Sequence, residues 1–159
     1  MKNKKEYLNK KNNYFHGIMF HHFHNTKKHK SGQGSISGKK FIQIINFIGK
    51  KNILNADEFL EKFKKKKLKK NHVCLTFDDG ALSQYDIALP ILNRYKIKAF
   101  FFFYSSMFTN KPDLLEIYRF FRLNFFKSVK HVYQEFYTSL KKDYKNFLKK
   151  NINKIKKNK

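Results

Sequence analysis

Two adjacent carboxylates, Asp78 and Asp79 (the Asp pair), follow a short apolar run and precede Gly80. The run, residues 73–77, places apolar side chains at alternate positions, which predicts a buried β-strand. Gly80 allows a tight turn at the end of this strand. Because consecutive side chains of an extended chain point to opposite sides, one carboxylate can bind a divalent cation while the other takes a proton. The alternative is a strand that ends in an ordinary Asp-Gly turn.

The elements around the Asp pair have to position it. Residues 81–95 are expected to form a helix, which Pro90 kinks or divides. This helix is predicted to bury Leu82, Tyr85, Leu89 and Leu92. Ala99–Phe103 is continuously apolar, as in a parallel strand that is covered on both faces. We therefore predict that the strand carrying the Asp pair lies between His16–Phe20 and Ala99–Phe103, with all three strands parallel.

These segments resemble the polysaccharide deacetylase family. The motif Thr76-Phe77-Asp78-Asp79-Gly80 is followed by the Pro-Ile-Leu-x-x-Tyr pattern of residues 90–95 and then by the strand at residues 97–102, in the family's order. Residues 19–24 are similar to the family's opening strand. The resemblance covers roughly residues 16–122. It implies an α/β fold, a partial (β/α) barrel of about three strand-helix units plus C-terminal helices.

The resemblance also implies a reaction, the metal-dependent hydrolysis of an N-acetyl C–N bond on a sugar or polysaccharide. In that family a divalent cation, usually zinc, polarises the acetamide carbonyl and acidifies a bound water, and a carboxylate takes the proton. By position, Asp78 matches the family's catalytic base and Asp79 matches its metal ligand. The pattern identifies no substrate-binding residue.

The histidines that complete the family's metal site do not follow the Asp pair. Family members carry His-(Ser/Thr)-x-x-His, whereas His131 is here the one histidine after the motif. A zinc site normally uses about three protein ligands. If residues 19–24 form a continuous strand, His22 and His24 face one side and His21 faces the other. His22 and His24 are therefore candidate metal ligands, with zinc the expected metal if the site is completed.

The carboxyl ends of parallel strands meet at one edge of a sheet, where reacting groups collect. We expect the Asp pair at this edge of the sheet, with His22 or His24 close to the same edge. His16 and His29 are expected at surface positions outside the site. Replacing either carboxylate by an amide is expected to leave the metal-free stability nearly unchanged, or to raise it, because repulsion between neighbouring charges is relieved.

Length predicts an incomplete barrel. The chain has 159 residues, whereas a deacetylase barrel of about seven strand-helix units generally needs about 200 or more. An incomplete parallel sheet leaves unpaired edges, which a second chain completing the barrel would cover. We expect a basic flexible lead at residues 1–13, a partial deacetylase-like domain at residues 14–126 and a lysine-rich helical segment at residues 127–159.

Other segments have clear helix signals. Apolar residues at helical spacing, Phe41, Ile44, Ile45 and Ile48, predict a core-facing helix that starts near Ser37. Asn55 is expected to cap a helix over residues 57–64 with its side chain. Further helices are predicted at residues 113–122, 129–140 and 143–155.

The chain is strongly basic, with 36 Lys plus Arg against 11 Asp plus Glu and a net charge of +25. Only three of these residues are arginines, whereas specific phosphate and base recognition favours the forked guanidinium group. We expect non-specific attraction to polyanions but no specific nucleic acid. Three classes stay open: a deacetylase-like enzyme with weak or no activity alone, a non-catalytic relative that binds carbohydrate or protein, and a basic nucleic-acid-binding protein.

A cytoplasmic location is expected. The single cysteine, Cys74, lies in the predicted buried strand, so no disulfide can form within the chain. Neither a signal peptide nor an apolar run long enough to span a membrane is recognisable in the sequence.

Overall fold

The computed structural model describes residues 16–32, 34–145, 149 and 151. The chain divides into two compact units, the first ending at Thr109 and the second beginning at Asn110. This division lies earlier than the domain boundary at residue 126, which stays a prediction. The predicted lead at residues 1–13 lies outside the described residues, as does most of the predicted helix at residues 143–155.

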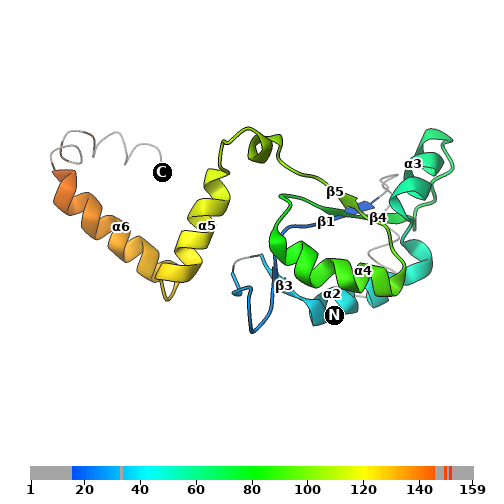
Figure 1. Cartoon of the computed structure of the whole chain (residues 1–159), viewed down its shortest axis with the longest axis horizontal. Helices are drawn as coiled ribbons and strands as arrows, with labels where there is room; N and C mark the ends of the chain where they lie inside the picture. The colour runs from blue at the N-terminus through cyan, green and yellow to red at the C-terminus, as the bar shows by residue number, and fades with distance from the viewer. Residues whose placement is uncertain (1–15, 33, 146–148, 150, 152–159) are drawn as a thin grey trace. The chain divides into compact units, whose positions relative to one another are not determined.

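The central sheet lies in the first unit and has three parallel strands. Their order is β1 (His16–Phe20), β4 (Val73–Phe77) and β5 (Phe100–Phe101), as Figure 1 shows. The prediction of three parallel neighbours, with the strand carrying the Asp pair in the middle, is confirmed. β5 is shorter than the predicted strand over Ala99–Phe103.

The register of the sheet aligns three phenylalanines across it. Phe20 of β1 lies opposite Phe77 of β4, and Phe77 lies opposite Phe101 of β5. The ladder continues past the strand ends, because Asp78 N donates to Phe20 O over 3.0 Å and Phe102 N donates to Phe77 O over 2.7 Å. The carboxyl ends of β1, β4 and β5 are therefore level with one another.

The predicted opening strand through residue 24 is interrupted. β1 ends at Phe20, and a separate strand β2 (Phe23–His24) pairs in parallel with β3 (Ile36–Ser37) to form a second, two-stranded sheet. Phe20 and Phe23 are both buried in one core, with ring centroids 6.1 Å apart. Residues three apart in a continuous strand would point to opposite faces, so the chain has to bend between them. The predicted alternation of side chains, which put His22 and His24 on the same side of one continuous strand, is therefore wrong.

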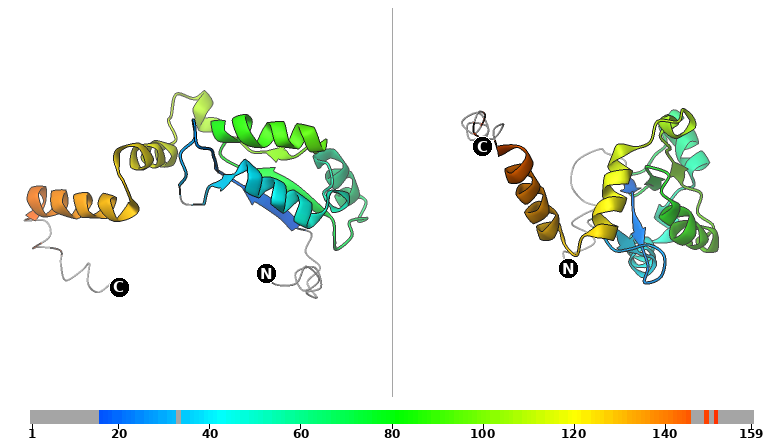
Figure 2. Two further views of the ribbon diagram at one scale, coloured as in Figure 1. Left: turned by 90° about the horizontal axis from the view of Figure 1, so that it is seen from below. Right: turned by 60° about the vertical axis from the view of Figure 1, so that its left-hand side comes forward.

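Helices α2 (Gly38–Ile48) and α4 (Leu89–Tyr95) lie side by side against one face of the central sheet (Figure 1, Figure 2). Their close approach occurs at Gly38, where a Cβ atom would lie 3.2 Å from side-chain atoms of both Ile87 and Ile91. A residue without a side chain therefore permits this packing.

The start predicted for α2 is confirmed by its N-cap. Ser37 Oγ accepts a hydrogen bond from Lys40 N over 3.1 Å, which satisfies one of the amides that a helix leaves free in its first turn. Phe41 and Ile45 are buried, while Ile44 and Ile48 are partly buried against the same core. The predicted core face of this helix is therefore correct.

The helix after the Asp pair begins with a π-helical turn, η2 (Gln84–Ala88), before α4. Leu89 N donates to Gln84 O, five residues back, so this turn is wider than an α-helical turn. The wider turn changes which side chains face inward. Leu82 and Tyr85 are exposed, contrary to the prediction, and Gln84 is buried instead.

The first unit also contains η1 (Lys50–Asn52) and α3 (Ala56–Lys64), which precede β4, and η3 (Ser105–Phe108), which follows β5. Asn55 precedes α3 but makes no side-chain cap, contrary to the prediction. Its Oδ1 accepts from Lys98 N over 2.8 Å. A tertiary bond to the segment before β5 has replaced the local one.

Aromatic side chains dominate the core between the sheet and its helices. Phe77 is fully buried, and its ring centroid lies 5.4 Å from that of Phe20, 5.9 Å from that of Phe41 and 4.7 Å from that of Phe101. The other side of the sheet is less covered. There Met19 is 57% exposed and Phe102 is 54% exposed. The continuous apolar character of the segment around β5 therefore does not mean that both faces are covered.

The second unit contains α5 (Leu114–Phe125) and α6 (Val129–Asp143). α6 begins where the sequence predicts and α5 begins one residue later than predicted, and both have a side-chain cap. Asp113 accepts from Leu115 N, and Ser128 accepts from His131 N. No helix among the described residues of either unit is long and apolar enough to cross a membrane.

The loop after β2 is anchored to the π-helical turn by an ion-pair cluster. Asp86 Oδ2 lies 2.8 Å from Lys28 Nζ and 2.7 Å from His29 Nε2. His29 is partly buried, so the expectation of an uninvolved surface position is wrong. Its partner Asp86 lies within the helix predicted over residues 81–95, and their contact spans 57 positions of the chain.

The pKa of Asp86 is lowered by its contact with Lys28 and then by its contact with His29. A carboxyl group whose folded-state pKa is below the unfolded value of 3.8 stabilises the fold above that value. This stabilisation is lost as the pH falls through the folded-state pKa.

We expect Asp86→Asn to lower the free energy of unfolding near neutral pH, and the difference from wild type to shrink as the pH falls through the folded-state pKa of Asp86. Urea unfolding across this pH range measures the difference. Glu58→Gln is the control, because Glu58 pairs with Lys62 within one exposed helix and such pairs contribute little. A difference for Asp86→Asn that does not change with pH would contradict the expectation.

Candidate active site

The Asp pair follows β4 directly, at the edge of the sheet where the carboxyl ends of the parallel strands meet. His21 and His22 follow β1 directly and reach the same edge. The register that aligns Phe20 with Phe77 brings these two segments together. The site is therefore assembled by strand pairing between residues far apart in the chain.

A left-handed turn takes the chain away from β4. Asp79 has φ of 75° and Gly80 has φ of 60°. Aspartate tolerates this conformation better than most side chains, and glycine adopts it without strain. A Cβ atom at Gly80 would also lie 2.9 Å from Cε1 of Phe103. Both the backbone conformation and the close ring favour glycine after the Asp pair.

The structure brings two histidines to Asp79. His21 Nδ1 lies 2.8 Å from Asp79 Oδ2, and His22 Nε2 lies 3.9 Å from the same oxygen. The Asp79 side chain is only 11% exposed. His24 is engaged elsewhere, with its Nδ1 2.8 Å from Ser35 Oγ. His21 did not appear among the candidates from the sequence, because those candidates depended on an unbroken strand.

Gln84 forms hydrogen bonds to both segments of the site, the one after β1 and the one after β4. Its Nε2 donates to His21 O over 2.7 Å and also to Asp78 O. Gln84 is 2% exposed, so these bonds form away from water, where leaving a carbonyl without a partner is costly. Ser83 supports the same junction, because its Oγ accepts from Phe23 N over 3.2 Å.

Sequence analysis missed Gln84, although a signal was present. Gln84, Ala88 and Leu92 recur at a spacing of four residues, and all three are buried. A polar residue in register with apolar helix positions indicates a buried amide that needs partners. The two carbonyls at the ends of β1 and β4 are these partners.

The donor atoms around Asp79 are of the types that zinc binds. Zinc takes carboxylate oxygen and imidazole nitrogen at roughly 2.0–2.2 Å, so two ligand atoms of a tetrahedral ion lie about 3.3–3.6 Å apart. The separations from Asp79 Oδ2, 2.8 Å to His21 and 3.9 Å to His22, lie on either side of this value. Asp79 therefore offers a divalent cation one carboxylate oxygen with one imidazole nitrogen beside it, from His22 or from His21.

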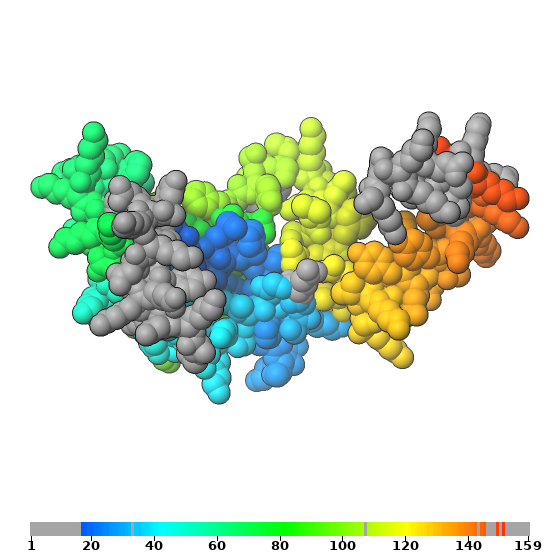
Figure 3. All heavy atoms as spheres, turned by 180° about the vertical axis from the view of Figure 1, so that it is seen from behind, coloured from blue at the N-terminus to red at the C-terminus, as the bar shows by residue number. Residues whose placement is uncertain are grey.

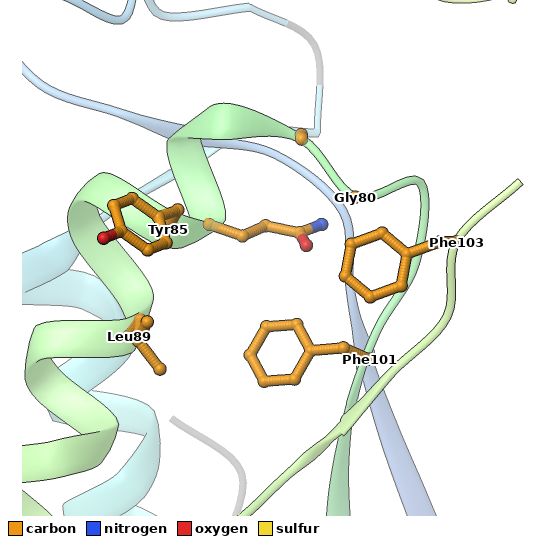
Figure 4. Close-up of a pocket in the computed structure, with 7 residues that line it drawn as sticks. Gly80, Tyr85, Leu89, Phe101 and Phe103 are labelled. Carbon is orange, nitrogen blue, oxygen red and sulfur yellow. The ribbon is translucent and has the colours of Figure 1, made fainter. Parts of the chain in front are cut away.

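A pocket of about 330 Å³ opens beside the turn that follows the Asp pair. Phe101 and Phe103 form one side of it, and Tyr85 and Leu89 form the other, as Figure 4 shows. Its walls are almost entirely apolar. A sugar carries hydroxyl groups that need polar partners when they are buried, so this pocket does not match a carbohydrate ring.

Residues 65–122 match the family model described as polysaccharide deacetylase. The matched segment contains β4, the Asp pair, the π-helical turn and β5. The resemblance inferred from the motif is therefore confirmed for this segment. No curated protein sequence matches the chain.

Two solved structures are similar to the chain. A de-N-acetylase from Aggregatibacter actinomycetemcomitans is 21% identical, with 55% of this chain and 36% of that protein covered and a TM-score of 0.45. The Streptococcus pyogenes deacetylase PplD, in complex with acetate, is also 21% identical, with 69% and 52% covered and a TM-score of 0.47. The chain thus spans about a third and about half of the lengths of these two proteins.

We expect Gln84→Met to destabilise the fold by about 2–4 kcal/mol, because it removes two buried hydrogen bonds and leaves the carbonyls of His21 and Asp78 without this donor. Methionine keeps the length of the side chain, so little of the loss comes from packing. Gln134→Met on exposed α6 is the matched control and should change stability by less than about 0.5 kcal/mol. Urea unfolding of both variants tests this expectation, and equal effects would contradict it.

We expect metal-free Asp79→Asn to change the free energy of unfolding by less than about 1 kcal/mol, because asparagine tolerates the same positive φ and can still bond His21. Asp79→Ala should cost about 1 kcal/mol more, since alanine adopts this conformation poorly. Thermal melts in the presence of a chelator compare the two variants. A loss of several kcal/mol for the asparagine variant would show that Asp79 is a structural cap.

Proposed function

We propose that this chain carries part of the active site of a polysaccharide deacetylase, which removes acetyl groups from an N-acetylated carbohydrate by hydrolysis. The contact of His21 and His22 with Asp79, at the carboxyl ends of two paired strands, is the observation that supports this most directly. The family match over residues 65–122 supports the same reaction class.

In this proposal Asp79 and His22 hold a divalent cation, with His21 next to them on the same carboxylate oxygen. A bound cation of this kind polarises a carbonyl and acidifies water. His24 stays a candidate ligand from the sequence alone, since its Nδ1 lies against Ser35. Zinc is the proposed metal, because the donors are imidazole nitrogen and carboxylate oxygen.

Asp78 is the proposed base. It takes the proton of the attacking water and then supplies a proton to the leaving amine. A cation held by Asp79 would offset the repulsion between the two neighbouring carboxylates.

We propose that the chain alone turns over slowly. The family's His-(Ser/Thr)-x-x-His pair does not occur in the 159 residues given, and a further part of the barrel, such as a partner chain, would supply it. The alternatives of a non-catalytic carbohydrate-binding relative and of a nucleic-acid-binding protein predict that the Asp pair has no influence on metal binding.

We expect Co²⁺ to bind the chain with a visible absorption band typical of nitrogen and oxygen ligands, and Asp79→Asn to weaken this binding at least about tenfold. Asp86→Asn is the matched control, because Asp86 also lies against a histidine but at the loop anchor. Titration followed by absorbance measures both variants. Equal Co²⁺ affinities in wild type and Asp79→Asn would contradict the proposed metal site.

Acetate release from an N-acetylated chito-oligosaccharide tests the reaction itself, with Zn²⁺ or Co²⁺ present. We expect a slow rate that Asp78→Asn abolishes while Co²⁺ affinity stays within about threefold, since a base contributes roughly 10²–10⁴ to rate rather than to metal binding. Release unaffected by Asp78→Asn would contradict the role of Asp78. Fast release by the chain alone would show that the histidines before residue 30 suffice.

A further inference from the structure

The helix α6 (Val129–Asp143) is amphipathic along its whole length. At 100° per residue, its apolar side chains fall on one side of the helix and form a single band, here called the aromatic stripe: Val129, Val132, Tyr133, Phe136, Tyr137 and Leu140. Gln134 and Thr138 lie on the opposite side. The ring centroids of Tyr133 and Tyr137 are 6.4 Å apart, so the stripe is continuous over one helical turn.

The central residues of the aromatic stripe are exposed. Tyr133 is 57% exposed, and Phe136 and Tyr137 are each 55% exposed. Figure 3 draws the atoms of α6 in orange. None of the described residues of the second unit whose burial is assigned is buried, so the described part of this unit offers the stripe no core. α6 also lies beyond residue 122, where the family match ends.

Lysines lie along one side of the stripe. Residues 127–159 contain eleven lysines, two acidic residues and no arginine. Lys130 and Lys141 lie next to the stripe on the helix surface, on the side of Tyr137. A partner that matches both features has an anionic surface with an apolar layer directly beneath it.

Two other kinds of partner match less well. A helix of 15 residues is about 22 Å long, so pairing of two stripes would bury only a few hundred Å² per copy, below the roughly 800 Å² of a standard interface. Nucleic acid would use the lysines but would leave the aromatic stripe in water, and the segment lacks the arginines that base and phosphate recognition favours.

We propose that α6 docks on an anionic lipid bilayer, lying parallel to the surface with the aromatic stripe toward the acyl chains and its lysines among the lipid phosphates. This is the arrangement that basic amphipathic helices adopt at membrane surfaces. Tyrosine suits it, because its ring is apolar while its hydroxyl group reaches the headgroups. The lysines add attraction at close range that salt weakens.

The absence of tryptophan from the chain allows a direct test with single reporters in the full-length protein. Phe136→Trp places the reporter in the stripe, and Thr138→Trp places it on the opposite side of the same helix. Each variant is mixed with vesicles of phosphatidylcholine alone or of phosphatidylcholine and phosphatidylglycerol in equal parts. We expect the Phe136→Trp emission to shift to the blue and to lose quenching by acrylamide on the anionic vesicles, and Thr138→Trp to change little.

Cosedimentation separates insertion from adsorption of a basic protein. We expect Tyr133→Ser with Phe136→Ser to reduce partitioning onto the anionic vesicles at least about tenfold, because two aromatic side chains no longer leave water. Gln134→Ser with Thr138→Ser places two serines on the opposite face as the matched control, and should stay within about twofold of wild type.

Three results would overturn the proposal. Equal responses of the two reporters would mean that charge alone brings the chain to the vesicle. Equal binding to neutral and anionic vesicles would remove the role of the lysines. A blue shift of Phe136→Trp without vesicles, growing with protein concentration, would assign the stripe to contacts between copies of the chain.

Discussion

Burial of Phe77 is the interaction on which the rest of the first unit depends. Its ring packs against Phe20, Phe41 and Phe101, which come from β1, α2 and β5. One side chain on the central strand therefore sets the position of both neighbouring strands and of the helix that covers them. Because Phe77 immediately precedes the Asp pair, the same packing determines where the two carboxylates emerge. The base of the candidate site is therefore part of the packed aromatic core.

A buried polar interaction joins the two segments that follow the aligned strands β1 and β4. Apolar packing aligns the strand ends, but the segments beyond them have no ladder of their own, and the amide of Gln84 bonds one carbonyl in each. The π-helical turn makes these hydrogen bonds possible, because it directs the Gln84 side chain into the core while the Tyr85 side chain stays exposed. The backbone on either side of the contact between His21 and Asp79 is thus held by the buried amide of Gln84. Buried hydrogen bonds specify geometry more narrowly than apolar contacts do.

The described structure exposes more apolar surface than a self-contained domain of this size usually does. Met19 and Phe102 are exposed on the uncovered side of the sheet, and the aromatic stripe is exposed on α6. These surfaces differ in character. The sheet side belongs to parallel strands whose edges accept further strands, whereas the stripe has lysines beside it and no sheet edge. The two surfaces therefore favour different partners: further strands for the first and, as proposed above, an anionic lipid surface for the second.

The sequence by itself determined the parallel α/β class, the central strand with its Asp pair, the N-cap of α2 and the start of α6, because each depends on local periodicity or capping. The break between Phe20 and Phe23 followed from tertiary structure, since the shared core buries both rings and so directs His21 to Asp79 and His24 to Ser35. Long-range partners likewise decided the roles of Asn55, His29 and Gln84. Each of these side chains has local options of similar energy, so the choice among them depends on which distant group the folded chain brings within reach.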